Sequence, residues 1–86
     1  MDITKKIDGN SVTITLAGRL DVVTSNQLSS ELANIFEQGE VNLVFDFGSL
    51  EYISSAGLRV MLTAQKKVNA MGTTMKIINV SETVKE

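Results

Sequence analysis

Apolar residues occupy every second position in the segment 11–17, where Val12, Ile14 and Leu16 alternate with threonines. A period of two with β-branched residues is typical of a strand that buries one face. Residues 2–7 form a weaker strand candidate, and the turn signal Asp8-Gly9-Asn10 lies between the two segments. The chain is therefore predicted to begin with a β-hairpin.

The apolar spacing then changes from two residues to that of a helix. Leu28, Leu32, Ile35 and Phe36 follow one another at helical intervals. The preceding Thr24-Ser25-Asn26-Gln27 resembles a capping box with Thr24 as the N-cap, and Gly39 fits the position just after a helix. A helix is predicted between these two points.

A second strand-to-helix passage follows. Residues 41–47 are apolar on both faces, which suits an interior strand. A helix is predicted from the double serine Ser54-Ser55 to Gly72. Its expected buried residues are Leu58, Met61, Leu62, Val68 and Met71. Residues 75–80 are a last strand candidate, and Ser81-Glu82 resembles the start of another helix.

The expected order is thus β-β-α-β-α-β. Each strand-helix-strand passage favours a parallel pair of strands, whereas the hairpin is antiparallel. The sequence therefore predicts one α/β domain over residues 1–86, with a mixed sheet and helices packed on it.

Composition excludes several classes of function. The chain has no cysteine, which excludes disulfides, thiolate metal sites and cysteine nucleophiles. It has no histidine, so the commonest general base and the commonest metal ligand are both missing. Its formal net charge of −2 offers no general attraction for nucleic acid or an anionic membrane. No apolar run approaches the ~18 residues that would cross a bilayer. We expect a cytoplasmic domain without metal or cofactor.

The two serines at the second helix are the main candidates for a functional site. Ser54 is expected to cap the helix, which leaves the Ser55 hydroxyl free at the first helical position. Gly57 in the first turn lowers helix propensity, and either close packing on the sheet or close approach of a partner backbone could offset that cost. Asp21 and Asp46 are expected near the same sheet edge, as turn or cap residues or, less favoured, as a catalytic pair.

Three motifs together resemble the STAS domain of bacterial anti-sigma-factor antagonists. They are Leu16-Ala17-Gly18-Arg19-Leu20-Asp21, Val44-Phe45-Asp46-Phe47 and Tyr52-Ile53-Ser54-Ser55-Ala56-Gly57-Leu58. The resemblance covers nearly the whole chain. It implies a protein-binding module that is not an enzyme: it would bind an anti-sigma-factor serine kinase and release it after phosphorylation.

The resemblance also assigns residues. Ser55 matches the phosphorylated serine, while Ser54 stands where the family often has an aspartate. Asp21, Ser54, Gly57 and Leu58 would line the surface that contacts the kinase, and the kinase would supply the ATP.

The family usually continues through a further helix, so the C-terminal helix is expected to be missing or incomplete after about residue 81. Exposed apolar surface near Ile77 or Ile78, with self-association through it, is the expected consequence. Two other functions stay open: a STAS scaffold subunit of a transport or sensory complex without phosphorylation, and a small-molecule or hydrolase site at the strand edge.

Overall fold

The computed structural model describes residues 1–80, and the expected helix start at Ser81 lies outside them. The predicted α/β class and the order β-β-α-β-α-β are confirmed. The elements are β1 (Asp2–Asp8), β2 (Ser11–Leu20), α1 (Val22–Glu37), β3 (Asn42–Ile53), α2 (Ser55–Met71) and β4 (Met75–Ile78).

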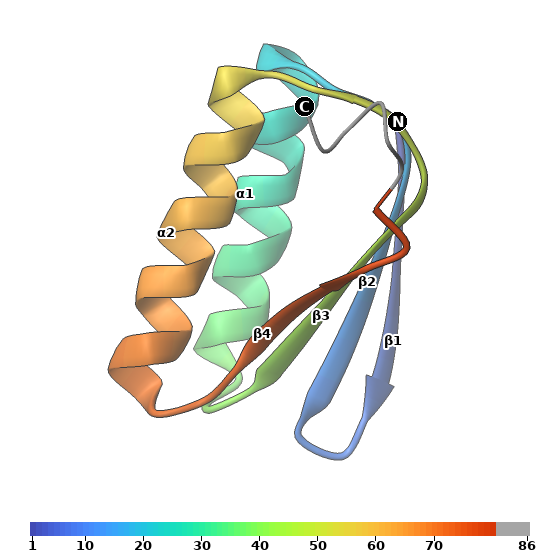
Figure 1. Cartoon of the computed structure of the whole chain (residues 1–86). Coiled ribbons are helices and arrows are strands. Elements are labelled where there is room, and N and C mark those ends of the chain that lie inside the picture. Colours follow the sequence, from blue (N-terminus) through green and yellow to red (C-terminus); the bar gives the residue numbers. More distant parts are fainter. Residues whose placement is uncertain (81–86) are drawn as a thin grey trace.

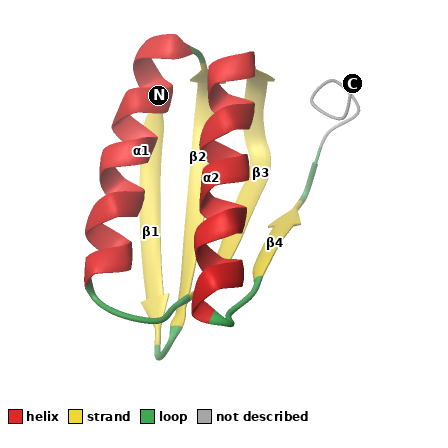
Figure 2. Ribbon diagram, turned by 90° about the vertical axis from the view of Figure 1, so that its left-hand side faces the viewer, coloured by secondary structure: helices red, strands yellow, loops and turns green. Residues whose placement is uncertain are grey.

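The four strands form one mixed sheet in the order β1-β2-β3-β4. β1 and β2 pair antiparallel, which confirms the hairpin, and the pairs β2–β3 and β3–β4 are parallel. Both helices lie on the same face of the sheet and run side by side (Figures 1 and 2). Because both helices follow parallel strands, they also start at the same end of the molecule.

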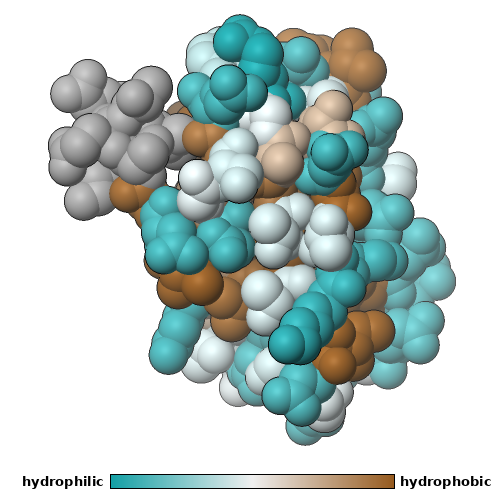
Figure 3. Space-filling view, turned by 90° about the vertical axis from the view of Figure 1, so that its right-hand side faces the viewer, coloured by the Kyte–Doolittle hydropathy of each residue, from teal (hydrophilic) through white to brown (hydrophobic). Residues whose placement is uncertain are grey.

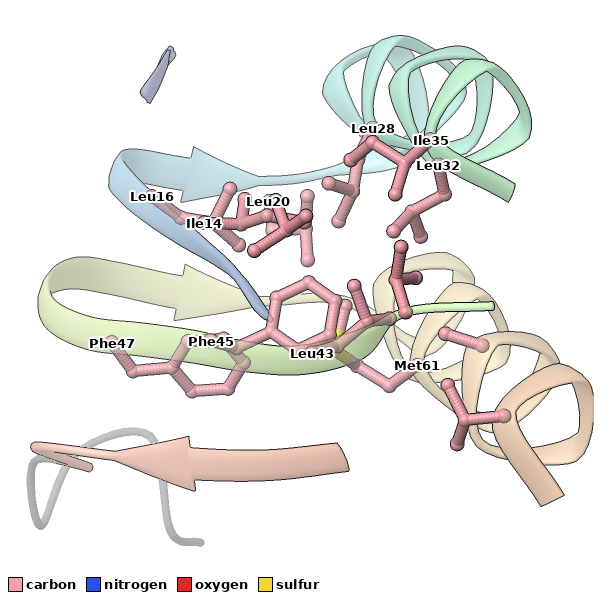
Figure 4. Close-up of a cluster of buried hydrophobic side chains, with 14 of the residues drawn as sticks. Ile14, Leu16, Leu20, Leu28, Leu32, Ile35, Leu43, Phe45, Phe47 and Met61 are labelled. Atoms are coloured by element: carbon pink, nitrogen blue, oxygen red, sulfur yellow. The ribbon is translucent and has the colours of Figure 1, made fainter. Parts of the chain in front are cut away.

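The core lies between this helix pair and the sheet (Figure 4). Every second residue of β2 and of the first half of β3 points into it, as the alternation predicted, and α1 adds a stripe at helical spacing. The labelled residues of this core include Ile14, Leu16, Leu43, Phe45, Leu28, Leu32 and Ile35, all of which are buried. Gly72 ends α2 in the left-handed conformation, as expected for a glycine C-cap.

Among residues 1–80, no helix lies on the other face of the sheet. Figure 3 views the molecule from this side and shows mostly hydrophilic and intermediate surface with separate apolar areas. The strand register places Thr15 between Thr4 and Asp46, and Thr13 between Lys6 and Val44. A sheet with one polar face explains why the strands alternate so regularly.

The structure corrects the predicted end of the third strand, because β3 continues beyond Phe47 to Ile53. Its register with β2 shifts between Thr15 and Ala17 and again between Gly18 and Arg19. At each shift β3 contains one residue more than β2, as in a β-bulge. Beyond Phe47 the next buried residue is therefore Leu50, three positions on, and the period of two is lost.

The predicted buried stripe of α2 is partly wrong. Met61 and Val68 are buried, but Leu58 and Leu62 are exposed. The buried stripe is completed by two small residues, Gly57 and Ala64. Small residues on that side let α2 approach the sheet closely.

The expected apolar surface at the end of β4 is present. Ile77 and Ile78 are 41% and 39% exposed, as predicted for the end of β4. Within residues 1–80 no helix is long and apolar enough to cross a membrane.

Candidate functional site

The starts of both helices lie together at the edge of the sheet that is formed by the carboxyl ends of β2 and β3 (Figure 1). β2 ends at Leu20 and leads through Asp21 into α1, while β3 ends at Ile53 and leads through Ser54 into α2. The Ser54 N–H donates a hydrogen bond of 2.9 Å to the Leu20 carbonyl. This bond joins the two strand-to-helix connections directly, so the predicted site residues of both segments come together here.

The two serines differ in their roles, as the sequence predicted. Ser54 is the N-cap of α2, and its Oγ accepts a hydrogen bond of 3.1 Å from the Gly57 N–H. Ser55 is the first residue of the helix, and its side chain is exposed. A helix N-terminus carries partial positive charge and tolerates an added anion well.

Asp21 is the N-cap of α1, so the prediction that Thr24 caps this helix is wrong. Asp21 Oδ1 accepts from the Thr24 N–H at 3.0 Å, and the Asp21 N–H donates to Thr24 Oγ1 at 2.8 Å. Thr24 is thus the second partner of the capping box. The hydrogen bonds from Thr24 hold the pKa of Asp21 below its ordinary value, because they stabilise the carboxylate.

Gly57 is buried in the first turn of α2. A Cβ at this position would lie 2.8 Å from Leu20 Cδ2 and 2.9 Å from Ile53 Cγ1. The structure therefore favours the first of the two explanations for this glycine, close packing of the helix on the sheet. Gly57 can shape a contact surface only through the position it gives to its neighbours.

Three exposed apolar side chains flank this edge. Leu58 in the first turn of α2 is 52% exposed, and Val22 and Val23 at the start of α1 are 65% and 69% exposed. The two valines were not among the predicted site residues, because the sequence pattern placed the helix cap at Thr24, beyond both of them. Large apolar side chains that face water beside a candidate site favour contact with another protein.

Asp46 does not lie at this edge, contrary to the prediction. β3 continues for seven residues beyond it, and its register beside Thr15 places it on the face without helices. Asp46 Oδ1 accepts hydrogen bonds from the Gly48 N–H at 2.9 Å and from Asn79 Nδ2 at 3.0 Å. The Asn79 and Gly48 bonds lower the pKa of Asp46. Asp21 and Asp46 therefore do not form a catalytic pair.

Nothing in residues 1–80 resembles a metal centre, since they hold no group of three acidic side chains that could bind an ion. At the same end of the sheet, Arg19 stacks on the ring of Tyr52 at 4.3 Å from its centroid. The pairing of these two residues across β2 and β3 explains the half-exposed position of Tyr52.

Two curated proteins are similar in sequence. BtrV of Bordetella bronchiseptica, named as a candidate anti-sigma factor antagonist, is 44% identical over 63 residues, which are 73% of this chain and 53% of BtrV. The anti-sigma-B factor antagonist of Bacillus subtilis is 29% identical over 82 residues, which are 95% of this chain and 74% of that protein. The chain thus spans about half the length of the first relative.

Solved structures share the fold. Unphosphorylated SpoIIAA, an anti-sigma factor antagonist, superposes with a TM-score of 0.84 at 23% identity, over 95% of this chain and 76% of SpoIIAA. A candidate antagonist from Thermotoga maritima gives a TM-score of 0.88 at 16% identity, over 96% of this chain and 72% of that one. The model of the STAS domain matches residues 2–86. The chain therefore belongs to the STAS domain family.

Proposed function

We propose that this chain is an anti-sigma-factor antagonist that acts in the cytoplasm by binding an anti-sigma-factor serine kinase. It binds the kinase while Ser55 is unphosphorylated, and phosphorylation of Ser55 releases the complex. The names of BtrV and of the Bacillus subtilis relative support the class of function. The SpoIIAA fold is known in a phosphorylated form, which supports the switch.

The main support for this proposal is the different environment of the two serine side chains. The Ser54 hydroxyl is engaged with the Gly57 N–H, whereas the Ser55 side chain is exposed at the helix start. A kinase could therefore modify Ser55 without removing the cap of α2. The chain itself would be a substrate and would catalyse nothing.

Phosphorylation of Ser55 would change the charge at the start of α2. A phosphate would add about −1.5 to −2 charges, so the formal net charge of −2 would roughly double. At the N-terminus of α2 this charge is stabilised by about 0.3–1 kcal/mol, so the domain should stay folded. The effect would be felt at the partner, through repulsion of acidic groups and the desolvation of a dianion.

The contact surface would combine the predicted residues with those that the fold adds. Leu58 would supply apolar contact beside Ser55, and Val22 and Val23 would extend it along α1. Asp21 and Ser54 would act mainly by fixing the helix starts, since their side chains already cap α1 and α2. Gly57 would set how deep α2 sits on the sheet.

The test is to mix the purified chain with a candidate anti-sigma kinase and ATP, and to map phosphate by mass spectrometry. We expect one phosphate on Ser55 in the wild type and in Ser54→Ala, and none in Ser55→Ala. In calorimetry, Ser55→Asp should lose kinase affinity while its circular dichroism is unchanged.

Two outcomes would contradict the proposal. Unchanged affinity of Ser55→Asp would remove the switch. A protein isolated from its native cells without any phosphate, but bound in a transport or sensory complex, would instead support the scaffold function.

A further inference from the structure

A groove of about 450 Å³ runs between α1 and α2 and begins about one helical turn beyond Ser55, at Arg59. Its floor contains the buried Leu32 and Ala64, and Phe36 and Val60 contribute further apolar surface. The exposed Ala33 leaves space on the α1 wall, since a larger side chain there would enter the groove. The volume is within the ~300–1,000 Å³ that small-molecule sites occupy.

The charges around the groove are unevenly placed. The α2 wall carries Arg59 and Lys67, and the α1 wall carries Glu37 in the last turn of that helix. Within residues 1–80 the one salt bridge joins Lys5 and Glu31, so neither cation of the groove has an acidic partner there. The two helices run side by side from the same end (Figure 2). Arg59 is the fifth residue of α2 and lies toward the helix starts, whereas Glu37 is the last residue of α1 and lies toward the helix ends.

This pattern selects the kind of occupant. A stable protein interface needs about 800 Å² on each partner, which is much more than ten groove residues offer. At the end toward the helix ends, Lys67 and Glu37 carry opposite charges, whereas Arg59 is the one charged residue of the groove toward the helix starts. An apolar floor with this net positive end fits a molecule that has an alkyl chain and one negative group. The net charge of the protein is −2, so its overall charge does not attract anions. The local positive charge of the groove would make it bind anionic amphiphiles more tightly than neutral ones.

We propose that this groove binds a small amphipathic anion, a carboxylate with an alkyl chain of medium length. Its carboxylate lies at the Arg59 end, away from Glu37, and its chain lies over Leu32 and Ala64 toward Phe36. This site is separate from the proposed phosphorylation of Ser55 and does not depend on it.

The test is titration of the full ¹⁵N-labelled chain with decanoate, below its micelle concentration, followed by NMR. We expect saturable shifts confined to residues 29–37 and 59–67. Arg59→Gln should weaken binding about three- to fivefold, as for a solvent-exposed ion pair. Lys66→Gln removes the same charge from a residue of α2 outside the groove and should leave the affinity unchanged.

A second variant tests the shape of the site. Ala33→Phe places a ring in the groove from an exposed position, so it should abolish binding while the remaining spectrum shows an intact fold. Equal affinity for decanol would overturn the role of the charge. Absence of saturable shifts, or shifts centred on Val22, Val23 and Leu58, would overturn the site.

Discussion

At the scale of single residues, the adjacent Ser54 and Ser55 show how one position along a chain changes what a hydroxyl can do. The Ser54 hydroxyl lies outside the first turn of α2, where it satisfies the Gly57 N–H. One residue further on, the Ser55 side chain is exposed. The same side chain is thus structural in one place and available for chemistry in the next.

We predict that replacing Ser54 and replacing Ser55 by alanine have different effects on stability. Ser54→Ala should lower the free energy of unfolding by about 1 kcal/mol, because the cap is lost. Ser55→Ala should change it by less than about 0.5 kcal/mol, as for an ordinary surface site. Urea unfolding of the two variants checks this, and equal losses would mean that Ser55 shares the capping role.

We predict that Gly57→Ala destabilises the domain by about 1–2 kcal/mol. The new methyl group would overlap with Leu20 and Ile53, and overpacking costs more than the ~0.5–1 kcal/mol gained in helix propensity. The measurement is urea unfolding, repeated in a Leu20→Ala background as the control. The loss should shrink there because the smaller side chain leaves room; an undiminished loss would rule out this contact as the cause.

At the scale of elements, the sequence pattern predicted each strand and helix but not every boundary. The alternation located β2 and the first half of β3, where one face is buried. It failed after Phe47 because two register shifts place the next buried residues, Leu50 and then half-buried Ile53, at intervals of three. A bulge depends on the partner strand, so a single strand's pattern does not reveal it.

The helices show a similar limit. In α2 two stripes have helical spacing, one through Leu58 and Leu62 and one through Gly57, Met61 and Ala64. The prediction placed Leu58 and Leu62 in the buried stripe because their side chains are large and apolar. The helix lies close to the sheet, so the side that faces the sheet carries small residues instead. The capping and exposure of the two serines could be predicted because they depend only on neighbouring residues. Predicting that Val22 and Val23 lie in the first turn of α1 would have required choosing Asp21 rather than Thr24 as the cap.

The hydrogen bond between Asp46 in β3 and Asn79 just after β4 predicts that the stability of the fold depends on pH. The hydrogen bonds from Asn79 and Gly48 lower the pKa of Asp46, so they favour the charged form in the folded state. Their stabilisation is present above the unfolded-state pKa and is lost as the pH falls through the lower folded-state pKa. The midpoint temperature of thermal unfolding should therefore fall less between pH 6 and pH 2 for Asp46→Asn than for the wild type.

A matched control for that measurement is Asp8→Asn, which removes one carboxylate from the last residue of β1. It should keep the acid-dependent loss of the wild type. If both variants follow the same curve, general charge repulsion rather than the Asp46 contacts sets the acid stability.

At the scale of the whole molecule, both helices that the structure describes lie on the same face of the sheet, and the edge strand β4 exposes Ile77 and Ile78. Neighbouring residues of a strand point to opposite faces, so apolar surface is present on both sides of this edge. Exposed apolar edge strands favour association between copies.

We predict that the sedimentation coefficient of the wild type rises with protein concentration. Replacing both Ile77 and Ile78 by threonine should suppress this rise while keeping strand propensity. Lys76→Thr, which leaves both isoleucines in place, is the control and should associate like the wild type. A wild type that stays monomeric at high concentration would contradict the prediction.

The hydrogen bond from the Ser54 N–H to the Leu20 carbonyl has a consequence for timing. It anchors the start of α2 to the main chain of a buried strand end, more than thirty residues away in sequence. If Ser55 is the phosphoacceptor, adding or removing the phosphate leaves this anchor intact. Resetting the protein would then require no refolding, and its pace would be set by the enzymes and the departing partner.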